Sequence, residues 1–177
     1  MVLLIEHGDQ GSIGLILNRP TGMVLGKGPS GMPLQLTNAP PEVQQVFANS
    51  RLYCGGFTAQ HVIHLLGGER VPGSQQVVQG VFMGGELAAA RAVSLGRASA
   101  EDFRFHAGAL VWEPEELQRH VDQGCWYTAA CSRALVLKQC LQLPTPLWRE
   151  VLMLMGGECA EVAAAEADGD SSDEEEP

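Results

Sequence analysis

The chain has 177 residues and is 45% hydrophobic, which suffices for the core of one globular domain. Nine acids and no base lie within residues 158–177. Residues 1–157 hold the other 12 acids against 11 bases, so the formal charge of −10 belongs mainly to the tail. The nearly neutral body argues against direct nucleic-acid binding, which needs clustered basic residues, and no apolar run approaches the ~18 residues of a membrane span.

The cysteine pattern predicts reduced thiols. The count of five is odd, and the sequence has no Cys-x-x-Cys motif. This favours small buried thiols in a reducing compartment over a disulfide framework or a zinc site, so we expect no metal and no cofactor. The N-terminus lacks the basic or Arg/Ser-rich stretch of a targeting segment. The protein therefore stays where it is made, or its address lies upstream of Met1.

The stretch from Gly11 to Gly22 organises the chain. Its apolar run is too short for a helix and lies between Gly and Asn-Arg-Pro, which predicts a buried central strand. Pro20 is expected to end this strand, because proline cannot donate to a ladder. With the apolar run at residues 2–6, the strand forms a predicted hairpin. Because a domain rarely begins in mid-strand, we expect that an N-terminal segment is missing before Val2.

Loops and short elements follow. Residues 22–36, rich in Gly and Pro, are predicted to be loop, and residues 38–49 a short helix. A strand at residues 52–54 ends at Gly55 and Gly56, which permit positive φ or a close approach of backbone to a ligand.

Residues 61–66 fit either a strand or a helix. A helix would place His61 and His64 on one face, whereas a strand places them on opposite faces. The apolar residues before the next glycine pair favour the strand. The sequence therefore predicts two core or edge histidines and no shared metal site.

The middle of the chain carries the clearest helix, at residues 86–95, preceded by a single predicted strand at 77–83. At residues 103–107, Phe and Ala alternate with Arg104 and His106. This alternation predicts a strand with one wet or functional face.

The last third is predicted to be mixed. A helix begins at Glu113 and runs to about Gln123, and its early carboxylates are explained by the positive end of the helix dipole rather than by a catalytic dyad. Residues 126–130 and 134–137 are predicted as two strands. A helix follows at residues 146–156, and its Trp and Met side chains are expected in the core.

Residues 163–177 are predicted to form an acidic tail that is disordered from about Ala167. Ser171 and Ser172 precede four acids, so an acidophilic kinase is a possible user of this segment. The alternative is a tail that only adds solubility.

Five sequence motifs are informative when they are considered together. They are Gly14-Leu-Ile-Leu-Asn18-Arg19-Pro20, Leu52-Tyr-Cys-Gly55-Gly56, Asp102-Phe-Arg104-Phe105 followed by Trp112, Trp126-Tyr-Thr-Ala-Ala-Cys131, and Leu147-Trp148-Arg-Glu-Val-Leu-Met-Leu-Met-Gly156-Gly157. Together they resemble the AlgH/YqgE family, and within it the plastid-type members.

The resemblance implies an α/β fold, with a bifurcated mixed β-sheet forming a pseudo-barrel, flanked by helices, in a single domain over residues 1–162. It implies a chloroplast location, with the cytoplasm as the alternative, and a further strand before the position of Val2. It also implies a regulatory role, because some bacterial members are linked to transcriptional regulation.

The first functional hypothesis is a non-enzymatic binding or regulatory module with a small anionic ligand or a protein partner. Polar strand ends, a glycine corner and an arginine fork suit an anion. The candidate ligand-binding residues are Asn18, Arg19, Gly55, Gly56, Arg104 and Trp112. The structural alternative is that Asn18 caps a turn and that Arg104 pairs with a helix carboxylate such as Glu113.

The second hypothesis is a cysteine/histidine-dependent hydrolase, and a thiol-redox protein is a third. Cys54 and Cys131 are the candidate thiols, and His64 and His106 the candidate bases. No spacing joins them, and the chain has no nucleophile elbow or phosphate-binding loop. The expectation therefore leans away from an enzyme.

Overall fold

The computed structural model describes residues 1–28, 32, 34–138, 140 and 143–169. The strands within them are β1 (Val2–Gly8), β2 (Gly11–Ile16), β3 (Pro20–Val24), β4 (Arg51–Cys54), β5 (Thr58–Gly67), β6 (Ser74–Val78), β7 (Val81–Gly84) and β8 (Phe103–Trp112). The helices are α1 (Pro41–Val46), α2 (Glu86–Ser94), α3 (Glu116–Asp122), α4 (Arg133–Val136), α5 (Leu147–Met155) and α6 (Gly157–Gly169), with a single 3₁₀ turn at Ala100–Asp102.

Strand β8 is the centre of a bifurcated, mixed sheet. One edge of β8 pairs antiparallel with β5. The other edge is shared: its first half pairs in parallel with β4, at Leu52 to Phe105, and its second half pairs antiparallel with β2, at Ser12 to Trp112. Strand β3 extends the β4 branch. The predicted bifurcated sheet is therefore confirmed.

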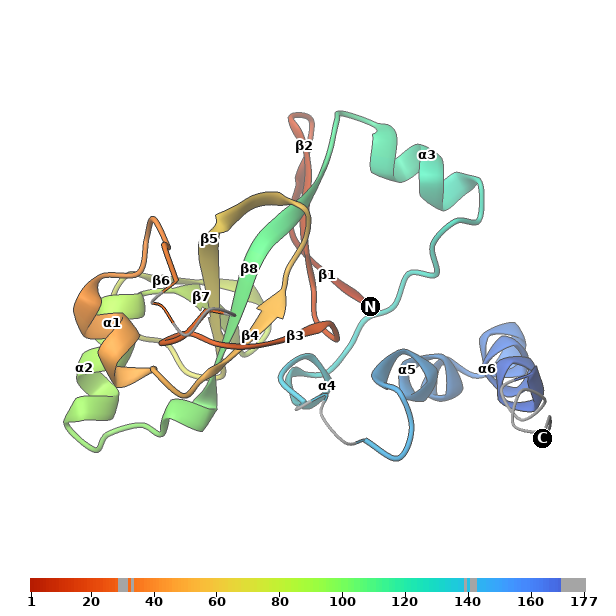
Figure 1. Ribbon diagram of the computed structural model, residues 1–177. Coiled ribbons are helices and arrows are strands. Elements are labelled where there is room, and N and C mark those ends of the chain that lie inside the picture. The colour runs from red at the N-terminus through yellow and green to blue at the C-terminus, as the bar shows by residue number, and fades with distance from the viewer. Residues whose placement is uncertain (29–31, 33, 139, 141–142, 170–177) are drawn as a thin grey trace.

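The sheet curls into a nearly closed barrel with one unsealed seam. The strand order is β1-β2-β8-β5-β7-β6, so β1 and β6 each have one neighbour along this path. The curl brings β1 and β6 close to one another without pairing them. Figure 1 shows α1 and α2 together at one end of the molecule, α4 near its middle, and α3, α5 and α6 toward the other end. The expected α/β pseudo-barrel flanked by helices is thus confirmed.

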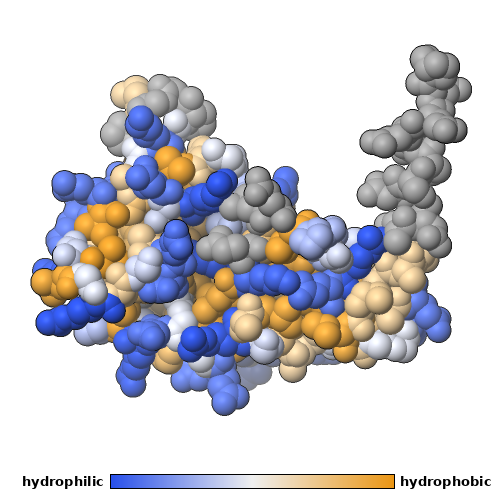
Figure 2. Space-filling view, turned by 90° about the horizontal axis from the view of Figure 1, so that it is seen from below, coloured by the Kyte–Doolittle hydropathy of each residue, from blue (hydrophilic) through white to orange (hydrophobic). Residues whose placement is uncertain are grey.

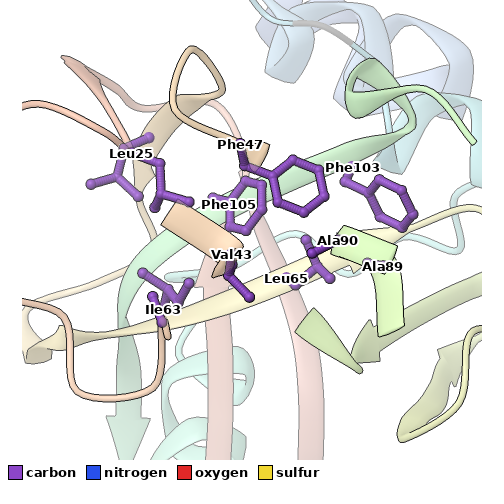
Figure 3. Packing of buried hydrophobic residues seen from close by; sticks show 11 residues of the cluster. Leu25, Val43, Phe47, Ile63, Leu65, Ala89, Ala90, Phe103 and Phe105 are labelled. Carbon is purple, nitrogen blue, oxygen red and sulfur yellow. The ribbon is translucent and has the colours of Figure 1, made fainter. Parts of the chain in front are cut away.

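Alternation along the strands separates two hydrophobic clusters. The outer cluster packs α1 and α2 against the sheet, and Figure 3 shows Phe47 between Phe103 and Phe105. The ring centroid of Phe47 lies 5.7 Å from that of Phe103 and 4.8 Å from that of Phe105, both edge to face. The inner cluster fills the barrel with Leu3, Leu15, Leu17, Leu66, Val81, Ala109 and Val136.

One predicted strand and part of one predicted loop are wrong. Residues 77–83 form the hairpin β6–β7 instead of one strand, because Gly80, at φ +75°, turns the chain between Val78 and Val81. Strand β3, Pro20–Val24, lies partly in the region predicted as loop. Strand β2 already ends at Ile16 and not at Pro20 as expected, and Pro20 instead begins this edge strand, where its missing N–H does no harm.

The two strands predicted at residues 126–130 and 134–137 are also wrong. Residues 126–130 have no regular structure, and residues 133–136 form the short helix α4, which Ser132 caps by accepting from the Leu135 N–H. A strand forms only where its backbone pairs with a neighbour, and residues 126–130 pair with no strand among the described residues.

The C-terminal end is more helical than predicted. Helix α6 extends to Gly169, whereas disorder was expected from about Ala167. The rest of the predicted acidic tail, with Ser171 and Ser172, lies outside the described residues. No helix within the described part of the chain is long and apolar enough to cross a membrane.

Candidate functional site

A group of polar side chains fills one end of the barrel interior. Tyr53 on β4 and His64 on β5 lie opposite His106 of β8, on its two sides. Arg104 is two residues before His106 and so shares its face. Both were predicted to lie on a wet or functional face; Arg104 is 2% exposed and His106 0%. The face is polar as predicted, but it points into the barrel and is not wet.

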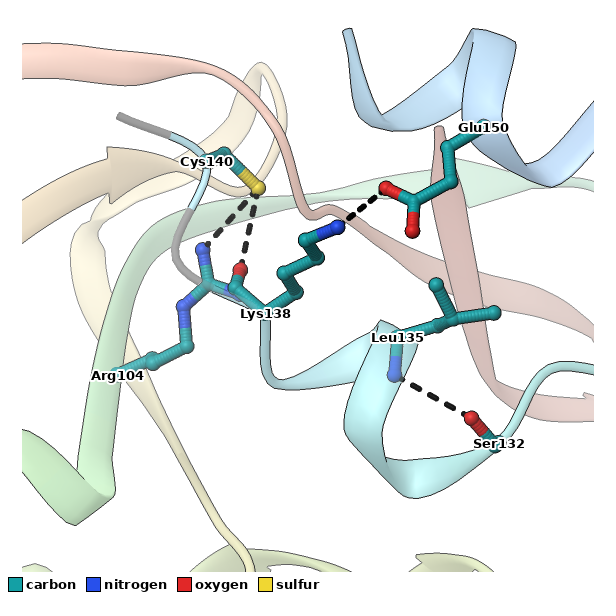
Figure 4. Close-up of polar contacts among 6 residues, drawn as sticks. All are labelled: Arg104, Ser132, Leu135, Lys138, Cys140 and Glu150. Atoms are coloured by element: carbon teal, nitrogen blue, oxygen red, sulfur yellow. Dashed lines mark hydrogen bonds and ion pairs between the residues drawn. The ribbon is translucent and has the colours of Figure 1, made fainter. Parts of the chain in front are cut away.

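Arg104 is bonded by main-chain carbonyls from two segments. Its Nη1 donates to the carbonyl oxygens of Val136 at 3.1 Å and Lys138 at 2.7 Å, and its Nη2 donates to that of Leu17 at 3.2 Å. Nη2 also lies 3.6 Å from the Sγ of Cys140. Figure 4 shows the guanidinium pointing at this thiol.

The Arg104 guanidinium has aromatic and dipolar neighbours rather than a counter-ion. It stacks over the Tyr53 ring at 4.5 Å. Within the described residues, no carboxylate forms an ion pair with it, so the predicted pairing with Glu113 is wrong. The Arg104 guanidinium therefore links the residue that follows β2 to the end of α4 and the residues after it.

His106 is held neutral in this interior. Its Nδ1 lies 3.0 Å from the carbonyl oxygen of Ile16, so the ring proton sits on Nδ1 and is donated there. Nε2 is buried without a hydrogen-bond partner among the described residues. Burial first, and then the nearby Arg104 charge, lower the pKa of His106 to about 3.

This shift predicts a pH dependence of stability. In the unfolded chain this histidine binds a proton below its ordinary pKa of 6.5, whereas in the folded protein the pKa of His106 is about 3. The contribution of neutral His106 to the free energy of unfolding is therefore fully present above pH 6.5. Between pH 6.5 and about 3 it falls with acidification by about 1.4 kcal/mol per pH unit. Urea unfolding from about pH 7 to about pH 5 should show this slope, reduced in His106→Asn, which stays neutral. Equal slopes in the two proteins would contradict the assignment.

The glycine corner is closed by backbone. The Gly55 N–H donates to the Ala107 carbonyl at 2.8 Å, and its carbonyl accepts from Ile16 N–H at 2.8 Å. A Cβ at Gly55 would meet the Gly108 oxygen at 2.3 Å, and one at Gly56 would meet the Ala109 carbonyl carbon at 2.0 Å. The two glycines thus permit close contact between backbones and leave no space for a side chain at their own positions.

Asn18, Arg19 and Trp112 lie in different surroundings. Asn18 accepts a hydrogen bond from the Met1 amino group at 2.7 Å, and Arg19 is exposed, with its guanidinium 5.4 Å from the Phe57 ring. Trp112 faces a large groove. Most of the six candidate residues make contacts within the chain. A joint ligand-binding role for them remains a prediction.

A large apolar groove has a volume of about 690 Å³. We call it the seam groove, since residues of β1 and the end of β6 line it together with α3, α5 and the segment between α3 and α4. Its lining is Met1, Val2, Leu3, Leu4, Leu17, Val78, Gln79, Trp112, Leu117, Val121, Cys125, Trp126, Tyr127, Thr128, Ala129, Ala130, Cys131, Val136, Trp148, Val151, Leu152 and Met155. No Asp, Glu, Lys, Arg or His is among these residues.

Large side chains of the seam groove are open to solvent. Tyr127 is 53% exposed and Trp126 38%, with the Trp126 ring edge-to-face against Trp112 at 6.1 Å. Met153 and Leu154 on α5 are exposed next to the groove residue Met155. Figure 2 shows apolar residues on the half that carries α5 and α6, and further apolar residues on the opposite half. Such patches on a soluble surface indicate binding sites.

Sequence reasoning missed this groove. Residues 126–130 were predicted as a strand and the Trp and Met side chains of α5 as core. One signal was available in the sequence. Trp126 and Tyr127 are followed by small residues, and the run lacks the alternation of apolar and charged residues that a half-exposed strand shows.

The enzymatic candidates are not brought together. Cys54 donates to the Gly56 carbonyl, with 3.6 Å between sulfur and oxygen, and Cys131 lies by the seam groove. No hydrogen bond joins a thiol to an imidazole in the part of the chain that the structure describes. Nor do those residues contain a cluster of three or more His, Cys, Asp or Glu that suits a metal ion.

Comparison with known proteins gives a consistent result. Residues 1–160 match the family described as AlgH-like, DUF179. A UPF0301 protein of Chlorobium luteolum is 27% identical over 161 residues, covering 89% of this chain and 77% of that one. A UPF0301 protein of Chlorobaculum tepidum is 28% identical over 166 residues, covering 92% and 80%.

Two solved structures share the fold. Protein DIP2367 from Corynebacterium diphtheriae has a TM-score of 0.67 and 17% identity, over 92% of this chain and 80% of that one. The AlgH protein from Pseudomonas aeruginosa has a TM-score of 0.62 and 20% identity, over 92% and 82%. At these identities the likeness concerns the fold alone.

Proposed function

Because this chain belongs to the AlgH-like family, whose matched relatives are named without an activity, we propose its function from the geometry: a non-enzymatic binding module. Its binding surface is the seam groove, and its occupant is an extended, uncharged segment of a protein partner. The finer expectations, an indirect role in transcriptional regulation and a chloroplast or cytoplasmic location, rest on the family resemblance and are part of the proposal.

One observation carries this proposal: β1 and the end of β6, two strands that lack a second neighbour in the strand order, both line an apolar groove. A strand edge presents unused N–H and C=O groups to an added strand, and alternate side chains of that strand would enter the apolar lining. A charged segment would lose hydration there, because no charged side chain lines the groove and the Met1 amino group already donates to Asn18.

The hydrolase and thiol-redox alternatives lack a comparable observation. General-base catalysis needs a base within about 3 Å of its nucleophile, and no described thiol donates to an imidazole. Neutral, buried His106 also has its Nδ1 engaged by Ile16.

Selection from a library of displayed peptides tests the proposed function. The selected peptides should be extended and alternately apolar, and Tyr127→Ala should weaken their binding about tenfold, as expected for a central aromatic contact. Phe57→Ala is the matched control, because Phe57 is 63% exposed and does not line the groove.

Three results would overturn it: selected peptides that bind as helices, equal losses in both variants, or a stable dimer that Tyr127→Ala dissociates. The last would give the groove to a second copy of the chain.

A further inference from the structure

A second hollow lies at the other end of the molecule, against α2. Its volume is about 470 Å³, and it is bordered by the loop after β5, by the second half of α2 and by the turn before β8. It shares no lining residue with the seam groove. Nothing derived so far for the AlgH-like chain uses it.

The charges around this hollow are mostly basic. Arg70, Arg91 and Arg97 line it, against Glu69 and Asp102. The Asp102 carboxylate is already engaged, since it accepts from the Ser99 N–H at 2.7 Å. Among the described residues, neither Arg70 nor Arg97 forms an ion pair. Three arginines thus line one recess of a chain whose formal charge is −10.

Arg91 adds a replaceable contact. Its Nε lies 3.9 Å from a carboxylate oxygen of Glu42, and both side chains are half exposed or more, at 65% and 50%. Pairs of this kind contribute little free energy, at most about 1 kcal/mol. A bound anion could therefore recruit Arg91 at small cost.

The rest of the lining is apolar. Val71, Ala92 and Phe103 are among the lining residues, and Leu95 at the rim is 64% exposed. A site of this volume falls in the usual range for small ligands, about 300–1,000 Å³. Guanidinium forks suit a phosphate better than a single carboxylate, because they donate paired hydrogen bonds to several oxygens.

From this combination we propose that the hollow binds a small organic phosphate, with the phosphate at the arginines and the apolar body against α2. The inference is independent of the seam groove and of its partner. AMP is the probe. Adenosine and inorganic phosphate are the two half-probes, because each contains one part of AMP.

Titration by calorimetry of the full chain tests the site. AMP should bind more tightly than either half-probe, and Arg70→Gln and Arg97→Gln should each weaken AMP binding about tenfold. Arg119→Gln, an exposed arginine on α3 outside the hollow, is the matched control and should leave the affinity unchanged. Binding should weaken as salt is added.

Several outcomes would overturn the proposal. One is the absence of AMP binding at concentrations up to about 10 mM, where even ligands near the weak end of the affinity scale register. A second is adenosine binding as tightly as AMP. A third is that Arg97→Gln lowers the melting temperature without changing AMP affinity, because Arg97 would then serve only the C-terminal end of α2.

Discussion

Replacing Gly56 with alanine is expected to destabilise the protein by more than about 4 kcal/mol, enough to remove most of the stability of a typical domain. The added Cβ would lie 2.0 Å from the carbonyl carbon of Ala109 and 2.2 Å from its oxygen. Both partners are buried backbone between β4 and β8, so no flexible side chain can move aside. Soluble yield and urea unfolding measure the effect.

Gly8→Ala is the matched control for this change. A Cβ at Gly8 meets no atom within 4 Å, and its φ is not in the left-handed region. Its free energy of unfolding should change by no more than about 1 kcal/mol. If Gly56→Ala unfolds at the same urea concentration as Gly8→Ala, the close backbone contact at the glycine corner is not real.

Replacing Arg104 with methionine is expected to cost about 3–5 kcal/mol of stability. Methionine fills much of the volume but leaves the carbonyls of Leu17, Val136 and Lys138 without their donor in the barrel interior. Lysine should cost less, about 2–3 kcal/mol, because an ammonium keeps donors but cannot span both segments as a planar fork does.

The control for Arg104 is Arg119→Gln on the exposed side of α3, expected to stay within about 0.5 kcal/mol of the natural chain. Urea unfolding of these proteins ranks them directly. An Arg104→Met protein as stable as the natural one would show that the guanidinium does not hold the segment after α4 in place.

The alternation of residues 103–106 shows how far local sequence pattern reaches. The alternation predicted a strand with two unlike faces, one carrying Phe103 and Phe105 and the other Arg104 and His106. The structure confirms the strand and the difference between its faces. Which face meets water could not be predicted, because it depends on the closure of the barrel by β2, β4 and β5 around β8. Barrel closure is set by pairings distant in sequence.

The errors have similar physical causes. Trp126 and Tyr127 have strand-forming side chains, but strand preference is realised only beside a pairing neighbour, and here the two residues line a groove instead. The surroundings of the candidate anion-binding residues could not be predicted for a similar reason. The glycines and Arg104 are used by backbones that converge only in the folded barrel. The hairpin at Gly80 was missed too, although in that case the turn glycine was a local signal that could have indicated it.

Hydrogen exchange at the seam tests most directly whether this open edge is the binding surface. In the free protein, the outward-facing amides of β1 and β6 should exchange rapidly, because neither strand has a second neighbour in the strand order. Adding a selected extended peptide should slow exchange at Val2–Leu4 and at Ser74–Val78, while the amides of β8 stay unchanged. Protection that appears at α1 and α2 instead, with the seam amides unaffected, would contradict the account.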